Sequence, residues 1–143
     1  NPWTHALQGK RILIISPFIE SIREKLDIRE KIYGVDLFPD CEFILLKPPQ
    51  THGDEDCEEF NIEFNKFCNE IIKIKDDFDV ALCSCGGYGN PICAFIYNIG
   101  KSAIYVGGVL QMYFGIYGER WLREFPEIMK LYLNNNSEKL CIL

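Results

Sequence analysis

Residues 79–91 read DVALCSCGGYGNP, and this stretch decides the fold. Its first half, Asp79 to Ser84, is a short apolar run of the kind typical of a strand buried on both faces. A glycine turn, Gly86-Gly87-Tyr88-Gly89, follows within two residues. Asn90-Pro91 then supplies an N-cap residue and the favoured first-turn proline, so we expect a helix to begin there. The stretch therefore predicts a strand, a turn and a helix, the repeating unit of parallel α/β sheets.

Similar units flank this stretch on both sides. Apolar runs at residues 11–16, 42–47 and 102–106 predict three further strands. Apolar residues at helical spacing predict one helix that ends at Gly34 and another over residues 60–74. The helix after Asn90-Pro91 is apolar nearly all round, so we expect it to be buried.

Strands that alternate with helices, joined by right-handed crossovers, define the expected architecture. We expect an α/β, Rossmann-like three-layer sandwich with a mostly parallel sheet of four to five strands in the order 2-1-3-4 and helices on both faces. Leu140 to Leu143 is a candidate for an added edge strand. The 143 residues predict a single domain, and the start at Asn1-Pro2-Trp3, without Met, favours a domain cut from a longer protein.

The composition excludes several classes of protein. An apolar fraction of 48% indicates a globular chain rather than a disordered one. The net charge of −6 disfavours a nucleic-acid binder, because phosphate backbones are held by clustered Lys and Arg. No apolar run approaches the roughly 20 residues of a membrane span. We expect a cytoplasmic location, in the host cytoplasm if the protein is viral.

Seven cysteines, an odd number, indicate reduced thiols rather than a disulfide framework. The only two histidines, His5 and His52, lie far in sequence from Cys83 and Cys85, which disfavours a zinc site. We therefore predict structural thiols and no bound metal.

The carboxyl ends of the strands are the expected ligand site, because sheets of this class bind ligands where the strand order reverses. Glycines there let a ligand approach the backbone closely, and free amides at a helix start attract an anion such as a diphosphate. The glycines could equally serve only to make tight turns. The candidate binding residues in these turns are Ser16, Pro17, Gly86, Gly87, Tyr88, Gly89, Asn90, Gly107, Gly108 and Gln111.

Two further groups of residues are candidates for chemistry. Asp54, in an acidic loop, could help to hold a divalent cation, and Glu20 could act as a general base, although both fit an exposed surface carboxylate as well. No cofactor is firmly implied. Arg120 and Trp121 could grip a phosphate and stack on a sugar or a base, or could anchor the tail to the core.

Several of these motifs together resemble a known family. They are Ala6-Leu7-x-Gly9-Lys10-Arg11, Ser16-Pro17-Phe18-x-Glu20-Ser21-Ile22, Gly86-Gly87-Tyr88-Gly89, Gly107-Gly108-x-x-Gln111 and Phe114-Gly115-Ile116-x-Gly118-x-Arg120-Trp121. From Trp3 to Trp121 the chain is similar to glycosyltransferase-like domains of bacterial surface-polysaccharide genes and giant DNA viruses, which are related to the GT-D type. That family usually has His in place of Ser16 and Ala in place of Gly87.

The resemblance implies a nucleotide-sugar donor and transfer of a sugar to a glycan acceptor. GT-D enzymes also carry an Asp-x-Glu motif in an early Gly-Asp-Gly-Glu stretch, which this chain lacks. Three interpretations follow: a glycosyltransferase domain, a non-catalytic sugar- or nucleotide-binding module within a larger sugar-modifying protein, or another mononucleotide-binding enzyme on the same scaffold. A fused domain or a second copy of the chain could be a partner.

Overall fold

A four-stranded parallel sheet forms the centre of the computed structural model, which describes residues 2–50, 58–136 and 141–142. Its strand order, β2-β1-β3-β4, is the one predicted. In register, Ile14 of β1 pairs with Leu45 of β2 on one side and Leu82 of β3 on the other. The strands are β1 (Arg11–Ile15), β2 (Glu42–Leu46), β3 (Val80–Cys83) and β4 (Ser102–Tyr105).

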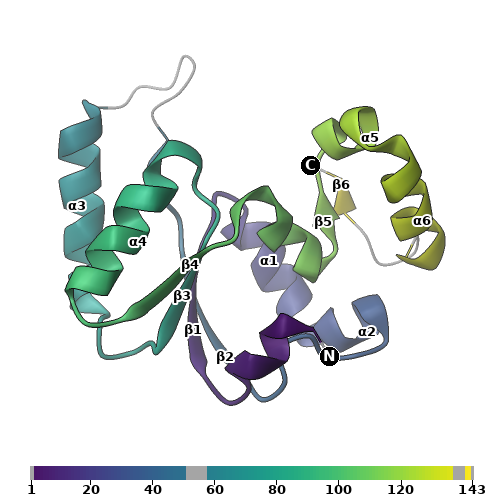
Figure 1. Ribbon diagram of the computed structural model, residues 1–143, viewed down its shortest axis with the longest axis horizontal. Coiled ribbons are helices and arrows are strands. Elements are labelled where there is room, and N and C mark those ends of the chain that lie inside the picture. The colour runs from purple at the N-terminus through teal and green to yellow at the C-terminus, as the bar shows by residue number, and fades with distance from the viewer. Residues whose placement is uncertain (1, 51–57, 137–140, 143) are drawn as a thin grey trace.

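Helices cover both faces of this sheet, as predicted. Helices α3 (Phe60–Lys73) and α4 (Gly89–Asn98) lie on one face, and α1 (Ile19–Lys25) lies on the other (Figure 1). Because side chains alternate along a strand, Leu13 and Ile15 enter the apolar cluster under α3 and α4, while Ile12 and Ile14 enter the opposite one. All four side chains are fully buried. The apolar run of β1 therefore contributes side chains to both hydrophobic cores, one on each face of the sheet.

The segment predicted as one helix up to Gly34 is broken. After α1 come the 3₁₀ helix η2 (Leu26–Ile28) and α2 (Arg29–Tyr33). Ile28 and Ile32 do not continue the face that Ile22 and Leu26 define, so the chain must turn to bury Ile32, which is 1% exposed. The end at Gly34 is confirmed, with a left-handed φ of 71°.

Helix α4 also differs from the prediction in two ways. It begins at Gly89, after the 3₁₀ helix η3 (Gly86–Tyr88), so Asn90 lies in the first turn and not at the N-cap. It is also buried on one side only: Ile96 is fully buried, whereas Tyr97 is 77% exposed. Among the described residues, no element packs against the outer side of this helix. Its apolar composition therefore gave the wrong prediction of burial on all sides.

The C-terminal part forms a separate small sheet rather than an edge of the main one. Strands β5 (Ile116–Tyr117) and β6 (Cys141–Ile142) pair with each other in parallel, so the expectation that this tail would add an edge strand to the main sheet is wrong. Leu140 and Leu143 lie outside the described residues. Helices α5 (Glu119–Glu124) and α6 (Pro126–Asn136) lie next to this small sheet, on the side away from the four-stranded sheet (Figure 1).

Two 3₁₀ helices complete the description: η1 (Trp3–Leu7) precedes β1, and η4 (Gly107–Phe114) follows β4. The hydroxyl of Tyr33 donates a hydrogen bond to the carbonyl of Met112, which ties α2 to η4. None of the helices in the described part of the chain combines the length and apolar character needed to cross a bilayer.

Candidate functional site

The turns after β1, β3 and β4 are aligned at one edge of the sheet by hydrogen bonds that continue past the strand ends. The amide of Ser84 donates to the carbonyl of Ile15 at 2.8 Å, and the amide of Val106 donates to the carbonyl of Cys83 at 2.9 Å. All four strands point the same way, so the turns rise side by side from the carboxyl edge. This is the edge at which the sequence predicts a ligand.

One cavity lies at the point where the strand order reverses, between β1 and β3. We call it the switch-point cleft, and its volume is about 280 Å³. Pro17 contributes to it from the turn after β1, and Gly86 and Gly87 from the turn after β3. Its described lining consists of Pro17, Pro48, Pro49, Gln50, Phe60, Cys85, Gly86, Gly87 and Tyr88.

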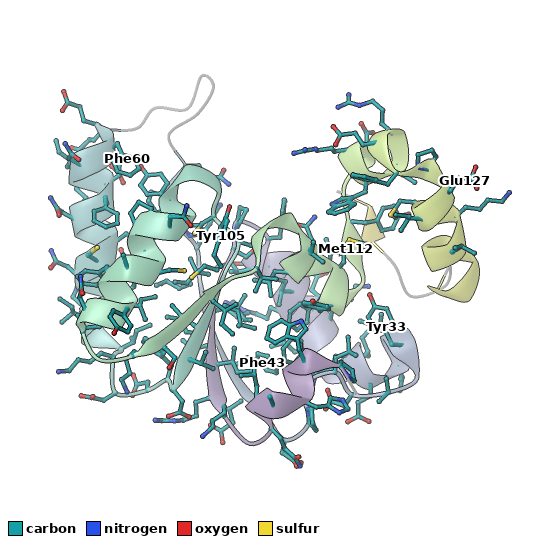
Figure 2. All side chains as sticks on the ribbon, viewed as in Figure 1. Tyr33, Phe43, Phe60, Tyr105, Met112 and Glu127 are labelled. Carbon is teal, nitrogen blue, oxygen red and sulfur yellow. The ribbon has the colours of Figure 1, made fainter. Side chains whose placement is uncertain are left out.

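Aromatic rings and bare backbone form the walls of this cleft. The rings of Phe60 and Tyr88 stack with centroids 4.4 Å apart and planes 20° apart. Figure 2 shows Phe60 at the end of α3 that borders the turn after β3. A β-carbon built on Gly87 would meet nothing within 4 Å, and no side chain caps the start of the ten-residue helix α4. The amides of Tyr88 and Gly89 donate to the carbonyls of Cys85 and Gly86, so the backbone left open to the cleft is that of the exposed Gly86-Gly87 turn. The cleft thus offers a flat apolar wall for a ring and the bare backbone of this turn for an anion.

A second cavity, which we call the Trp121 cavity, lies between the start of α1, η4 and α5. Its volume is about 490 Å³. It is lined by Phe18, Gly108, Val109, Gln111, Gly118, Arg120, Trp121, Glu124 and Phe125. It shares no lining residue with the switch-point cleft, although Pro17 and Phe18, which are adjacent in the chain, each line one of the two.

The residues predicted to form one site are therefore divided. Pro17, Gly86, Gly87 and Tyr88 line the switch-point cleft, whereas Gly108, Gln111, Arg120 and Trp121 line the Trp121 cavity. Ser16 is fully buried, and its hydroxyl accepts a hydrogen bond from the amide of Phe18 at 3.2 Å, so its role is to shape the turn. The other predicted residues line neither cavity: Gly89 packs under Tyr105, Gly107 makes a left-handed turn, and Asn90 is exposed.

Glu20, one of the two predicted carboxylates, lines neither cavity. The side chain of Glu20 is 76% exposed on α1, 3.6 Å from the guanidinium of Arg23. Asp54 lies outside the described residues. In the part of the chain that is described, no three His, Cys, Asp or Glu side chains gather closely enough to hold a metal ion.

Three thiols meet beneath the switch-point cleft. Cys83 at the end of β3 forms hydrogen bonds with the thiols of Cys85 and Cys93. The hydrogen bond from Cys83 lowers the pKa of Cys85, while the same contact together with burial raises the pKa of Cys83. Burial also raises the pKa of Cys93. Cys85 is the member of this group that lines the cleft, so the thiol whose pKa is lowered is the one that faces the cleft.

Sequence reasoning missed part of the cleft wall. Pro48, Pro49 and Gln50 follow β2 directly, and Phe60 begins α3. The position of the residues after β2 could have been predicted, because a residue that directly follows a parallel strand lies at the carboxyl edge of the sheet. From the sequence alone, two successive prolines after an apolar run indicate only the end of a strand.

No protein-family model, no curated protein and no solved structure matches the chain. The fold and the cavities define a class: a parallel α/β sheet with two ligand-sized cavities at its carboxyl edge.

Proposed function

We propose that this chain is a glycosyltransferase-type domain that binds a nucleotide-sugar donor in the switch-point cleft. The observation that carries the proposal is that Pro17 and the Gly86-Gly87 turn line one cavity across the reversal of strand order. Open α/β sheets bind nucleotides at this place. The resemblance of the chain to glycosyltransferase-like domains adds the expectation of a sugar on the nucleotide.

The chemistry of the cleft suits the two halves of such a donor. The stacked rings of Phe60 and Tyr88 offer an apolar surface to a nucleobase or a sugar. No Lys or Arg is among the described lining residues, so the diphosphate would be held by backbone amides of the Gly86-Gly87 turn. A divalent cation on the diphosphate would add to this binding.

A binding domain without its own catalytic base is the second candidate. It is favoured by one observation: the described lining of the switch-point cleft contains no Asp or Glu, and Glu20 points to solvent. Such a domain would hold the donor for a carboxylate from a fused domain or a second copy of the chain. Donor binding is common to both candidates, and release of nucleoside diphosphate in the presence of a glycan acceptor separates them.

Donor binding is tested by thermal unfolding with UDP-, GDP- and dTDP-sugars, with and without Mg²⁺. A ligand at about a hundred times its Kd adds roughly 2.7 kcal/mol to stability. The variant Gly87→Leu places a side chain in the cleft at a position where an added β-carbon meets nothing within 4 Å, so it should fold and lose the shift. Gly108→Leu, equally unhindered but in the Trp121 cavity, should keep it. The absence of a shift with every donor would refute the proposal.

A further inference from the structure

Gln111 is a buried residue whose amide has no partner among the residues that the structure describes. The residue is 5% exposed in η4 and lines the Trp121 cavity. Its side-chain amide forms no hydrogen bond with the described residues, although buried polar groups in proteins almost always form one. The amide is not among the atoms closed off from solvent, so it opens onto the cavity that it lines. A carboxamide held in this way at a cavity wall can donate one hydrogen bond and accept another, so it indicates a ligand with neighbouring donor and acceptor groups.

Aromatic rings form much of the remaining wall. Trp121 and Phe125 lie with ring centroids 5.4 Å apart at an angle of 37°, and Phe18 lines the same cavity. Phe125 is 44% exposed, so much of its ring is left uncovered by the described residues. Rings of this kind pack against the C–H face of a pyranose while polar groups at the edge bind its hydroxyls.

The charges in the cavity favour a neutral ligand. The Nε of Arg120 lies 2.9 Å from a carboxylate oxygen of Glu124, so the two lining charges compensate each other. A phosphate would meet repulsion from Glu124 and would compete with it for the guanidinium. Vicinal hydroxyls, in contrast, can bridge a guanidinium and a carboxylate, since each group presents two atoms in a plane.

We propose that the Trp121 cavity is a binding site for a neutral saccharide, with Gln111 as its buried hydrogen-bonding group and Trp121 as its stacking surface. If the switch-point cleft holds a nucleotide-sugar, as proposed above, this second site is that of the glycan acceptor. Pro17 and Phe18 line the two cavities as neighbours, so the two ligands would approach each other over the end of β1. The saccharide site itself stands on the Trp121 cavity alone.

Saturation-transfer NMR with the full chain tests the site, with methyl glycosides of glucose, galactose, N-acetylglucosamine and rhamnose as probes and glucose 6-phosphate as the charged comparison. We expect transfer to at least one neutral glycoside and weaker transfer to the phosphate. Gln111→Leu should weaken binding about tenfold, the effect of losing hydrogen bonds to one buried group. Trp121→Ala should abolish binding, and Trp121→Phe should retain part of it.

Two controls keep the outcome clear. Gln111→Leu should unfold at the same temperature as the unmodified chain or higher, because it removes an unpaired polar group; a loss of stability would show that Gln111 serves the fold instead. Gly87→Leu should bind the glycosides normally.

The outcomes separate the two proposals. Saccharide binding without any donor-induced shift in stability would reject the donor proposal alone. Donor binding that is lost in Gly108→Leu and kept in Gly87→Leu would place the nucleotide in the Trp121 cavity and overturn the saccharide site. Transfer to none of the glycosides would also overturn it.

Discussion

The ring of Tyr105 covers the α-carbon of Gly89: a β-carbon built on Gly89 would lie 2.1 Å from Cε2 of that ring. Tyr105 ends β4, and Gly89 begins α4. The hydroxyl of Tyr105 also donates to the carbonyl of Gly86 at 3.4 Å (Figure 2 labels Tyr105 at this end of β4). Through Tyr105, the edge strand β4 thus packs against the glycine turn of the switch-point cleft. Glycine is needed at residue 89 because the ring leaves no room for a β-carbon, not because a ligand contacts it.

This packing predicts that the effect of Gly89→Ala changes sign with residue 105. The backbone of Gly89 is already helical, with φ −60° and ψ −52°, so alanine suits the conformation. Alone, Gly89→Ala must push the Tyr105 ring aside and should destabilise the protein by about 1 kcal/mol. In a Tyr105→Ala background, the same change should stabilise it by about 0.5 kcal/mol, because alanine is the better helix former.

Urea unfolding of the four proteins in this cycle measures the coupling directly. The matched control is Gly87→Ala, which has open space and should show the same small effect in both backgrounds. Additive effects of Gly89→Ala and Tyr105→Ala would show that the ring does not rest on Gly89.

Among Cys41, Cys68, Cys83, Cys85 and Cys93, Cys85 should be the first to react with iodoacetamide at neutral pH. Its pKa is lowered by the hydrogen bond from Cys83, whereas burial raises the pKa of Cys41, Cys68 and Cys93. Cys93 is the more exposed thiol, so an order set by exposure alone would put it first. Peptide mapping by mass spectrometry distinguishes the two orders, and Cys83→Ala should slow the labelling of Cys85.

The strand order could be predicted because each strand carries its own signal. A buried parallel strand is apolar at successive positions, and Ile12 to Ile15 show this directly. Right-handed crossovers then leave few possible orders. The break of the first helix after Lys25 was not predicted, since it depends on how Ile32 reaches the core and not on local preference.

The candidate site was predicted as a set of residues but not as two cavities. Sequence places Pro17 and Phe18 together after β1, yet the structure directs them to different cavities. The division depends on where η4 and α5 pack. Both segments lie far from Gly86 in the sequence, and their packing has no local signal. Phe125 and Glu124 had no signal of their own, because a surface helix commonly carries exposed aromatic and charged residues.

Phe114 should be among the most costly side chains to remove. It stacks on Phe38 with centroids 5.6 Å apart and planes 4° apart, and both rings are at most 1% exposed. Phe114→Ala should lower the free energy of unfolding by about 3–5 kcal/mol through lost burial and a cavity. Tyr97→Ala, at a site 77% exposed, should change it by about 0.5 kcal/mol or less. Equal losses in the two variants, measured by urea unfolding, would contradict the stacked core.

Asp79 should make stability depend on pH at the acidic end. Its carboxylate accepts hydrogen bonds from the side chain and the amide of Arg11, at 2.8 Å and 2.9 Å, and these lower its pKa from 3.8 to about 2. Because the folded pKa is the lower one, the stabilisation is complete above about pH 4 and is lost as the pH falls through 2. Asp79→Asn should therefore lower the urea midpoint at pH 7 and have a diminishing effect between pH 4 and pH 2. Asp27→Asn, which removes an exposed carboxylate on η2, is the control for net charge. A deficit in Asp79→Asn that stays constant over this pH range would show that the Arg11 pair does not depend on the charge of the carboxylate.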